Sequence, residues 1–111
     1  MRFDLQTLLR EHAQDSERYR ELLRAPDLSV GLYRLPRGAE DLQKPHTEDE
    51  LYYGLSGRAH LRVGAIDHEV GPGTLVFVAA GDAHRFHAIE EDLAVLVIFG
   101  PAEGSRETPK A

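Results

Sequence analysis

The chain has 111 residues, a length typical of one domain with its own core, because single domains most often contain about 100–150 residues. Its formal net charge is −6 at pH 7 and its lysines and arginines form no cluster, which argues against nucleic acid as a partner, since phosphate binding needs a basic face. The absence of cysteine excludes disulfides and thiolate metal sites, and we expect a reducing compartment.

The sequence contains no pattern typical of export or of membrane insertion. The first residues, Met1 to Asp4, do not begin the uninterrupted apolar segment of a secretory signal. The longest apolar run, Leu93 to Phe99, is far shorter than the ~20 residues of a membrane-spanning helix. We therefore expect a soluble, cytoplasmic domain without a membrane partner.

A short amphipathic helix is predicted over residues 4–13. Leucines recur there on a helical period, and Asp4 is a suitable N-cap. The apolar stripe of this helix must cover one end of the domain or a partner subunit. Residues 16–24 fit either a second helical turn or a strand, and the Ala25-Pro26-Asp27 triplet ends that element.

From residue 28 on, short apolar runs separated by Gly and Pro indicate strands. A tight turn at Ser56-Gly57 and an acidic loop at 90–92 are expected between neighbouring strands. Short strands about every ten residues are typical of a sandwich or barrel, here over about residues 17–100 of one domain, 1–103. The polar segment 104–111 has no period and is expected to be a disordered tail. The expected strands are 28–35, 50–55, 58–63, 68–70, 75–78, 84–89 and 93–99. In the strand 58–63, Ala59, Leu61 and Val63 are expected to face the core, with His60 and Arg62 on the other side.

Two imidazoles and a carboxylate stand beside these predicted strands. Glu50 follows His46 by four residues, and His84 comes shortly after the apolar run at 74–80. Histidine supplies a neutral nitrogen and glutamate a charged oxygen, and this set leaves coordination positions open for water or substrate. The pattern predicts a site for one divalent transition metal ion, which is iron, manganese, nickel or zinc.

The spacing of these residues resembles the two motifs of the cupin family. The first motif, G-x5-H-x-H-x3-4-E-x6-G, is matched at Gly38, His46, Glu50 and Gly57. The second, G-x5-P-x-G-x2-H-x3-N, is matched at Gly73, Gly81 and His84. Three positions depart from the motifs: Lys44 replaces the first His, Ala79 the Pro and Ala88 the Asn. The resemblance implies an all-β double-stranded β-helix, the jelly-roll barrel of cupins, present once because no internal repeat is visible.

The resemblance also implies that the metal ligands are His46, Glu50 and His84. Glu48 competes with Glu50 for this role, but a bend before the strand is expected to turn Glu48 outwards. Lys44 cannot ligate a metal, because a charged ammonium group has no lone pair. It is either solvated or in contact with an anionic substrate at the rim. The missing ligand is then the amide oxygen of Gln43, or water.

Residues two apart in a strand share a face, so Tyr52 should point inwards with Glu50, and Phe86 with His84. We expect Tyr52 and Phe86 to bind the substrate, and Tyr52 is the candidate proton donor. The other histidines are expected to be structural or solvated; these are His12, His60, His68 and His87.

Three functions are compatible with this set of residues. The first is a metal-dependent enzyme acting on a small molecule, either dioxygenase-like with iron, or an isomerase or decarboxylase with a metal that polarises a carbonyl. The second is a small-molecule-binding module without catalysis, and the third is a structural or oligomerisation barrel. The metal-dependent enzyme is our first prediction. We also expect a homodimer, because many cupins pair through sheet edges.

Overall fold

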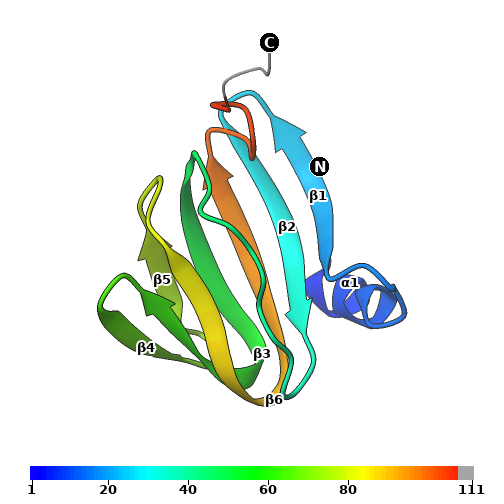
Figure 1. Cartoon of the computed structure of the whole chain (residues 1–111). Helices are drawn as coiled ribbons and strands as arrows, with labels where there is room; N and C mark the ends of the chain where they lie inside the picture. Colours follow the sequence, from blue (N-terminus) through cyan, green and yellow to red (C-terminus); the bar gives the residue numbers. More distant parts are fainter. Residues whose placement is uncertain (108–111) are drawn as a thin grey trace.

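Antiparallel strands form most of the chain in the computed structural model, which describes residues 1–107 (Figure 1). The elements are α1 (Leu5–His12), β1 (Tyr19–Ala25), β2 (Leu28–Leu35), β3 (Asp49–Val63), β4 (Ile66–Val70), β5 (Leu75–Val78) and β6 (His84–Gly100). The strands pair in the order β1-β2-β6-β3-β4, and β5 also pairs with β3. The expected all-β architecture with one short N-terminal helix is confirmed. Within the described residues, no helix has the length and apolar character needed to cross a membrane.

Helix α1 begins at its predicted cap and is attached to the first hairpin. The Asp4 carboxylate accepts a hydrogen bond from the backbone N–H of Thr7 at 3.2 Å. At the other end, the buried His12 donates from Nε2 to the carbonyl oxygen of Glu17 at 3.0 Å. The segment whose structure the sequence left open forms β1, which pairs with β2.

The two longest strands, β3 and β6, pair with each other through a register that shifts at several bulges. The tight turn expected at Ser56-Gly57 is wrong, because both residues lie inside β3. Gly57 has φ of +83°, and a Cβ atom there would lie 2.1 Å from the carbonyl oxygen of Asp92. A bulge and a turn both use the freedom of glycine, so the same residue is compatible with either.

The acidic loop expected at 90–92 is also wrong, because β6 continues from His84 to Gly100. Glu91 lies opposite Arg58 of β3 in the ladder, and cross-strand pairs of opposite charge favour a strand. Ala88 has φ of +47°, which marks a local bend before this acidic stretch. The acidic residues are therefore an exposed part of a continuous strand.

The barrel interior is one apolar core built from β2, β3, β4, β5 and β6. Residues Ala59 and Leu61 of β3 are buried as predicted, while Arg62 on the other face is exposed. The core consists of Leu35, Tyr52, Ala59, Leu61, Val70, Val76, Val78, Phe86, Ile89, Leu93, Val95, Val97 and Phe99.

The C-terminal segment differs from the expected disordered tail over residues 104–107. Two turns are closed by hydrogen bonds, from Ser105 N–H to the Ala102 carbonyl at 3.0 Å and from Glu107 N–H to the Gly104 carbonyl at 3.1 Å. Residues 108–111 lie outside the described part of the chain. The ordered turns bring Glu103 to the rim of the barrel.

Candidate metal centre

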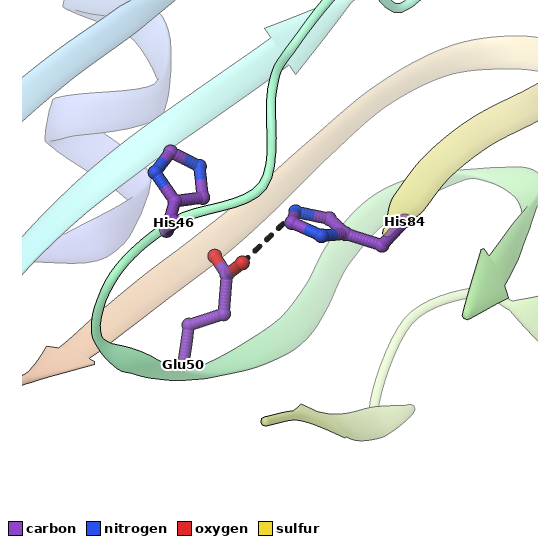
Figure 2. Close-up of side chains that lie close together, drawn as sticks. All are labelled: His46, Glu50 and His84. Atoms are coloured by element: carbon purple, nitrogen blue, oxygen red, sulfur yellow. Dashed lines mark ion pairs between the residues drawn. The ribbon is translucent and has the colours of Figure 1, made fainter. Parts of the chain in front are cut away.

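The three predicted ligands come from separate segments and lie together in the structure. His46 is in the loop before β3, Glu50 is the second residue of β3, and His84 is the first residue of β6. One ligand atom from each of the three side chains lies within 4.8 Å of the others. Figure 2 shows the Glu50 carboxylate near both imidazole rings.

Two hydrogen bonds join the segment before His84 to the segment that carries His46 and Glu50. The N–H of Gly81 donates to the carbonyl oxygen of His46 at 2.8 Å, and the N–H of Ala80 donates to Asp49 Oδ1 at 2.8 Å. Gly81 has φ of +80°, a conformation that glycine adopts without strain. Gly81, the second glycine of the second motif, thus joins the loop before His84 to the loop that carries His46.

Glu50 is a buried carboxylate whose hydrogen-bonding capacity is unused. The residue is 2% exposed, and neither Oε1 nor Oε2 accepts a hydrogen bond within the described chain. Its Oε1 atom lies 2.9 Å from His84 Nε2, an ion-pair contact whose geometry is not that of a hydrogen bond (Figure 2). A buried charge is costly unless a cation or several donors compensate it, and His84 faces only Oε1, so the site has an oxygen to offer a further cation.

The ring of His84 is held in one orientation by its neighbours. Its Nδ1 donates to the carbonyl oxygen of Asp82 at 2.9 Å, because a carbonyl only accepts. The other nitrogen, Nε2, then faces Glu50 and lies 3.1 Å from the Tyr52 hydroxyl. Burial lowers the pKa of His84, but the contact with Glu50 and the bond to Asp82 outweigh it and raise the pKa. A backbone partner on the second nitrogen is typical of histidines that bind metals.

Gln43 faces the site with its amide oxygen. Its Nε2 donates to Asp41 Oδ2 at 2.8 Å, while its Oε1 accepts from the Tyr52 hydroxyl at 3.1 Å and lies 3.4 Å from His46 Nε2. Lys44 is exposed, and the cavity beside the site is not lined by it. Gln43 therefore places an amide oxygen beside His46, one of the three predicted ligands.

Asp41 fixes the position of the loop that contains Gln43 through several hydrogen bonds. It is 3% exposed and accepts hydrogen bonds from the Tyr33 hydroxyl at 2.7 Å and from the backbone N–H of Phe86 at 2.9 Å, in addition to the bond from Gln43. A buried carboxylate with this many donors is well compensated. Asp41 therefore fixes which end of the Gln43 amide faces the site.

Glu48 does not point outwards as expected. It is 1% exposed and accepts hydrogen bonds from the backbone N–H groups of Gly104 at 2.7 Å and Arg106 at 3.1 Å, and from the Thr47 hydroxyl. Burial raises the pKa of Glu48, but these hydrogen bonds together lower it below its usual value. The Glu48 side chain turns away from the three predicted ligands, and its carboxylate accepts hydrogen bonds from the C-terminal turns.

A cavity of about 270 Å³ opens beside the cluster. Phe86 does not line it, because this side chain is fully buried behind Tyr52, with the two ring centroids 5.0 Å apart. Burial raises the pKa of Glu103 at the cavity rim. The cavity is lined by Tyr19, Tyr33, Gln43, His46, Tyr52, Val97, Phe99 and Glu103.

Comparison with known proteins places this architecture in a family. The profile of the cupin domain matches residues 31–99, which is more than half of the chain. The chain belongs to the cupin family. Its fold is the double-stranded β-helix that the two motifs predicted, and the expected relationship to small single-domain cupins is confirmed.

Three similar proteins were compared with this cupin in sequence or in structure. An uncharacterized protein of Streptomyces coelicolor is 48% identical over 101 residues, which are 91% of this chain and 96% of that protein. The crystal structure of TT1209 from Thermus thermophilus superposes with a TM-score of 0.72 at 27% identity, over 91% of this cupin and 97% of TT1209.

The third is an enzyme, the DMSP lyase DddQ of Ruegeria pomeroyi. It superposes with a TM-score of 0.66 at 26% identity and covers 77% of this cupin. The matched part is 42% of the lyase chain, so this cupin spans less than half of that structure. Cupin enzymes are therefore among its structural neighbours.

Sequence reasoning missed several residues around the site of this cupin. Asp41 and Glu103 belong to no motif, and neither do Tyr19 and Tyr33, although both tyrosines line the cavity. The loop at 39–44 has no period, so the sequence contains no pattern from which its hydrogen bonds can be read. Only the Tyr52 position could be predicted, because strand alternation places it two residues from Glu50.

Proposed function

We propose that this cupin is a metal-dependent enzyme acting on a small molecule, with one divalent transition metal ion held by His46, Glu50 and His84. The observation that supports this most directly is the buried Glu50 carboxylate, which accepts no hydrogen bond within residues 1–107 and stands beside two imidazole nitrogens. A divalent cation between these groups would compensate the carboxylate and bind Nε2 of His84 in place of its present contacts with Glu50 and the Tyr52 hydroxyl.

Gln43 supplies the fourth protein ligand in this proposal. Its oxygen is 3.4 Å from His46 Nε2, and its amide nitrogen is already engaged by Asp41. An amide oxygen is a harder ligand than imidazole, so the set favours iron, manganese, nickel or zinc over metals that need soft ligands. When bound, such an ion supplies Lewis-acid polarisation of a substrate oxygen, or oxygen chemistry if it is iron.

Tyr52 is our candidate for proton transfer. Burial, and next the nearby Glu50 carboxylate, raise its pKa well above the usual value, so the phenol keeps its proton at neutral pH. Its hydroxyl contacts Gln43 and His84, and the residue lines the cavity. From this position Tyr52 can donate a proton to a substrate held in the cavity. A proton donor in this position is compatible with an isomerase, decarboxylase or other acid–base reaction, and dioxygenase-like chemistry is the form expected with iron.

The cavity favours a neutral or positively charged small molecule. Tyrosine and phenylalanine rings form much of its wall, Glu103 also lines it, and neither Lys nor Arg lines it within residues 1–107. Aromatic faces attract cations, and a carboxylate at the rim repels anions. The similarity to a lyase, DddQ, supports a catalytic role for this family member.

A small-molecule-binding cupin without catalysis is the second candidate. It is favoured by the replacement of the first motif histidine with the exposed Lys44, because the loss of an imidazole weakens metal binding. In that case the same cavity serves as the ligand site, and Glu50 is paired with His84 alone.

We further propose a cytoplasmic homodimer. The absence of cysteine is typical of a reducing compartment. The outer surface of β3, β5 and β6 has an apolar face in two cross-strand rows, and a second copy of the chain would cover it symmetrically. We call this the outer apolar face; it consists of Leu51, Tyr53, Leu75, Phe77, Leu96 and Ile98.

Metal content measured by ICP-MS on untagged protein tests the proposal. Wild type, His46→Ala and His84→Ala are compared with Lys44→Ala, a neighbouring exposed residue, as the control. The expected result is that each histidine variant contains about one metal ion per chain fewer than wild type and Lys44→Ala. If wild type carries no metal and the barrel site binds none on addition, the binding-module alternative replaces the enzyme.

A further inference from the structure

A second group of potential metal ligands lies on the outside of the barrel. His60 of β3, Asp67 of β4 and His87 of β6 come from three neighbouring strands (Figure 1). His60 and His87 are directly opposite each other in the β3–β6 ladder. Asp67 is two residues from Glu69, which is the partner of His60 in the β3–β4 ladder. Diagonal neighbours of this kind are within reach of each other on one sheet face.

The side chains of this outer cluster converge on one point. Asp67 Oδ2 lies 2.9 Å from His60 Nδ1, and Asp67 Oδ1 lies 2.5 Å from His87 Nε2. The two ring centroids are 5.5 Å apart. One ligand atom from each of the three residues lies within 4.8 Å of the others. The carboxylate therefore stands between the two imidazoles, and each of its oxygens faces one ring nitrogen.

The outer cluster is separated from the barrel site by the core. The neighbours of His60 in β3, Ala59 and Leu61, are buried inside the barrel, and so is Phe86 beside His87. Because side chains alternate along a strand, His60 and His87 point to the opposite face. All three cluster residues are partly exposed, with side-chain exposures between 31% and 38%, so an ion from solution can reach them.

We propose that His60, Asp67 and His87 form a second binding site, on the outer sheet face, for zinc or a similar divalent transition metal ion. Two imidazoles and one carboxylate are ligands that zinc accepts, and water completes its four-coordinate shell. Nitrogen and oxygen ligands about 2.0–2.1 Å from a tetrahedral zinc are about 3.3 Å from each other. The present N···O distances are shorter by less than about 1 Å, so small side-chain rotations admit the ion.

Charges of both signs surround the outer cluster: Arg62 lies opposite Asp67, and Arg85 is paired with Arg62. A groove of about 330 Å³ beside His60 is also lined by Glu69 and Glu90, together with one cation, Arg58. Carboxylates near a site raise the local concentration of cations. The outer site uses none of the residues of the barrel site, so it does not depend on the proposed enzymatic function.

A metal ion at this position would connect three strands. It would hold β4, the last strand in the sheet order, to β3 and β6 at one point. Binding to the folded state alone raises the unfolding temperature. We therefore assign the outer site a stabilising role, and its open position leaves room for a further ligand.

The test is a titration of untagged, metal-free protein with ZnCl2, followed by calorimetry, and with CoCl2, followed by visible absorption. Wild type is expected to bind two ions per chain. Asp67→Asn and His87→Ala should each bind one ion, at the barrel site. Their affinity at the outer site should fall at least about tenfold, because replacing even a residue that only hydrogen-bonds to a metal ligand has an effect of that size. His68→Ala is the matched control, because His68 is on the same strand as Asp67 but on the other face.

A second variant separates the two proposals. His46→Ala with His84→Ala removes the barrel ligands and should still bind one ion, and that binding should disappear when His87→Ala is added. Circular dichroism confirms that each variant is folded. If the double variant fails to fold, the single substitutions His60→Ala and His87→Ala in wild type decide the question. The proposal is overturned if these substitutions leave the stoichiometry and affinity of wild type unchanged, or if His68→Ala lowers them equally.

Discussion

Asp41 accepts a hydrogen bond from the amide nitrogen of Gln43 at 2.8 Å, and this bond turns the Gln43 oxygen toward His46 and Tyr52. The Asp41 carboxylate is buried and also accepts from Tyr33 and from the backbone of Phe86, so its own position is fixed by β2 and β6. The amide oxygen of Gln43 thereby has a defined direction, although the loop that carries it has no secondary structure. Such supporting hydrogen bonds are what orient metal ligands in general.

Replacing Gln43 should weaken metal binding at the barrel site. Gln43→Ala removes the oxygen near His46, and we expect the affinity for the metal to fall about 10–100-fold. Lys44→Ala is the control, because Lys44 is exposed and should leave the affinity unchanged. Equal affinities for Gln43→Ala and Lys44→Ala in a zinc titration would contradict a ligand role.

Glu50→Gln should abolish the stabilisation that the metal provides. In metal-free protein the loss of the contact with His84 is offset by the removal of a buried carboxylate without hydrogen bonds, so we expect stability to change by only about 1 kcal/mol. In a His87→Ala background, which lacks the outer site, metal should raise the melting temperature of the protein that keeps Glu50 but not that of the Glu50→Gln variant. Thermal melts of both proteins with and without metal measure this. A metal-induced shift of equal size in both would rule out Glu50 as a ligand.

The sequence determined the barrel more reliably than its connections. Apolar runs and strand alternation predicted the strands and the inward side of Ala59 and Leu61. They did not distinguish turns from bulges, since Gly57 has the positive φ that both require. The acidic run at 90–92 was expected to be a loop, but it lies opposite Arg58 as part of a strand. Long-range pairing overrode the local signal in both places.

The candidate site was predictable where spacing fixes geometry. The ligand atoms of His46, Glu50 and His84 lie near one another, as the motif spacing indicated. Glu48 was expected to face outwards, because nothing in the sequence reveals that two backbone N–H groups of the C-terminal turns approach it. Contacts between segments far apart in the chain carry no local pattern, and Asp41 was missed for the same reason.

Glu48→Gln should release the C-terminal turns. The carboxylate of Glu48 accepts from the backbone of Gly104 and Arg106, and hydrogen bonds to a charged group contribute about 1.5–3 kcal/mol each. The amide can replace only part of this, so we expect a loss of about 1–3 kcal/mol in urea unfolding and faster proteolysis after Glu103. Glu69→Gln, an exposed carboxylate, is the control. An unchanged cleavage rate in Glu48→Gln would mean that other contacts hold the turns.

Gly57→Ala should destabilise the fold much more than Gly64→Ala. Both glycines have positive φ, so both substitutions introduce backbone strain of about 1 kcal/mol. At Gly57 the added Cβ would also lie 2.1 Å from the carbonyl oxygen of Asp92, whereas at Gly64 nothing lies within 4 Å. We therefore expect Gly57→Ala to cost at least about 2 kcal/mol more in urea unfolding. Similar losses for the two variants would show that β3 and β6 separate easily at the bulge.

Phe77→Asp should dissociate the proposed homodimer. Phe77 is 57% exposed on the outer apolar face, opposite Leu51 of β3. In a twofold interface each substitution occurs twice, so two carboxylates would enter one apolar contact. Every loss of about 1.4 kcal/mol in the free energy of association lowers the dimer affinity tenfold. Light scattering coupled to size exclusion should give a dimer mass for wild type and a monomer mass for Phe77→Asp.

Ile66→Asp is the matched control, because Ile66 is 63% exposed but lies on β4, outside the outer apolar face. It should remain a dimer, since its carboxylate stays in water. A monomer mass for wild type at micromolar concentration would contradict the homodimer. A dimer that tolerates Phe77→Asp but dissociates on substitution of the Leu5, Leu8 and Leu9 stripe of α1 would place the interface on the helix, because the half-buried leucines of α1 are the other apolar surface that the sequence offers to a partner.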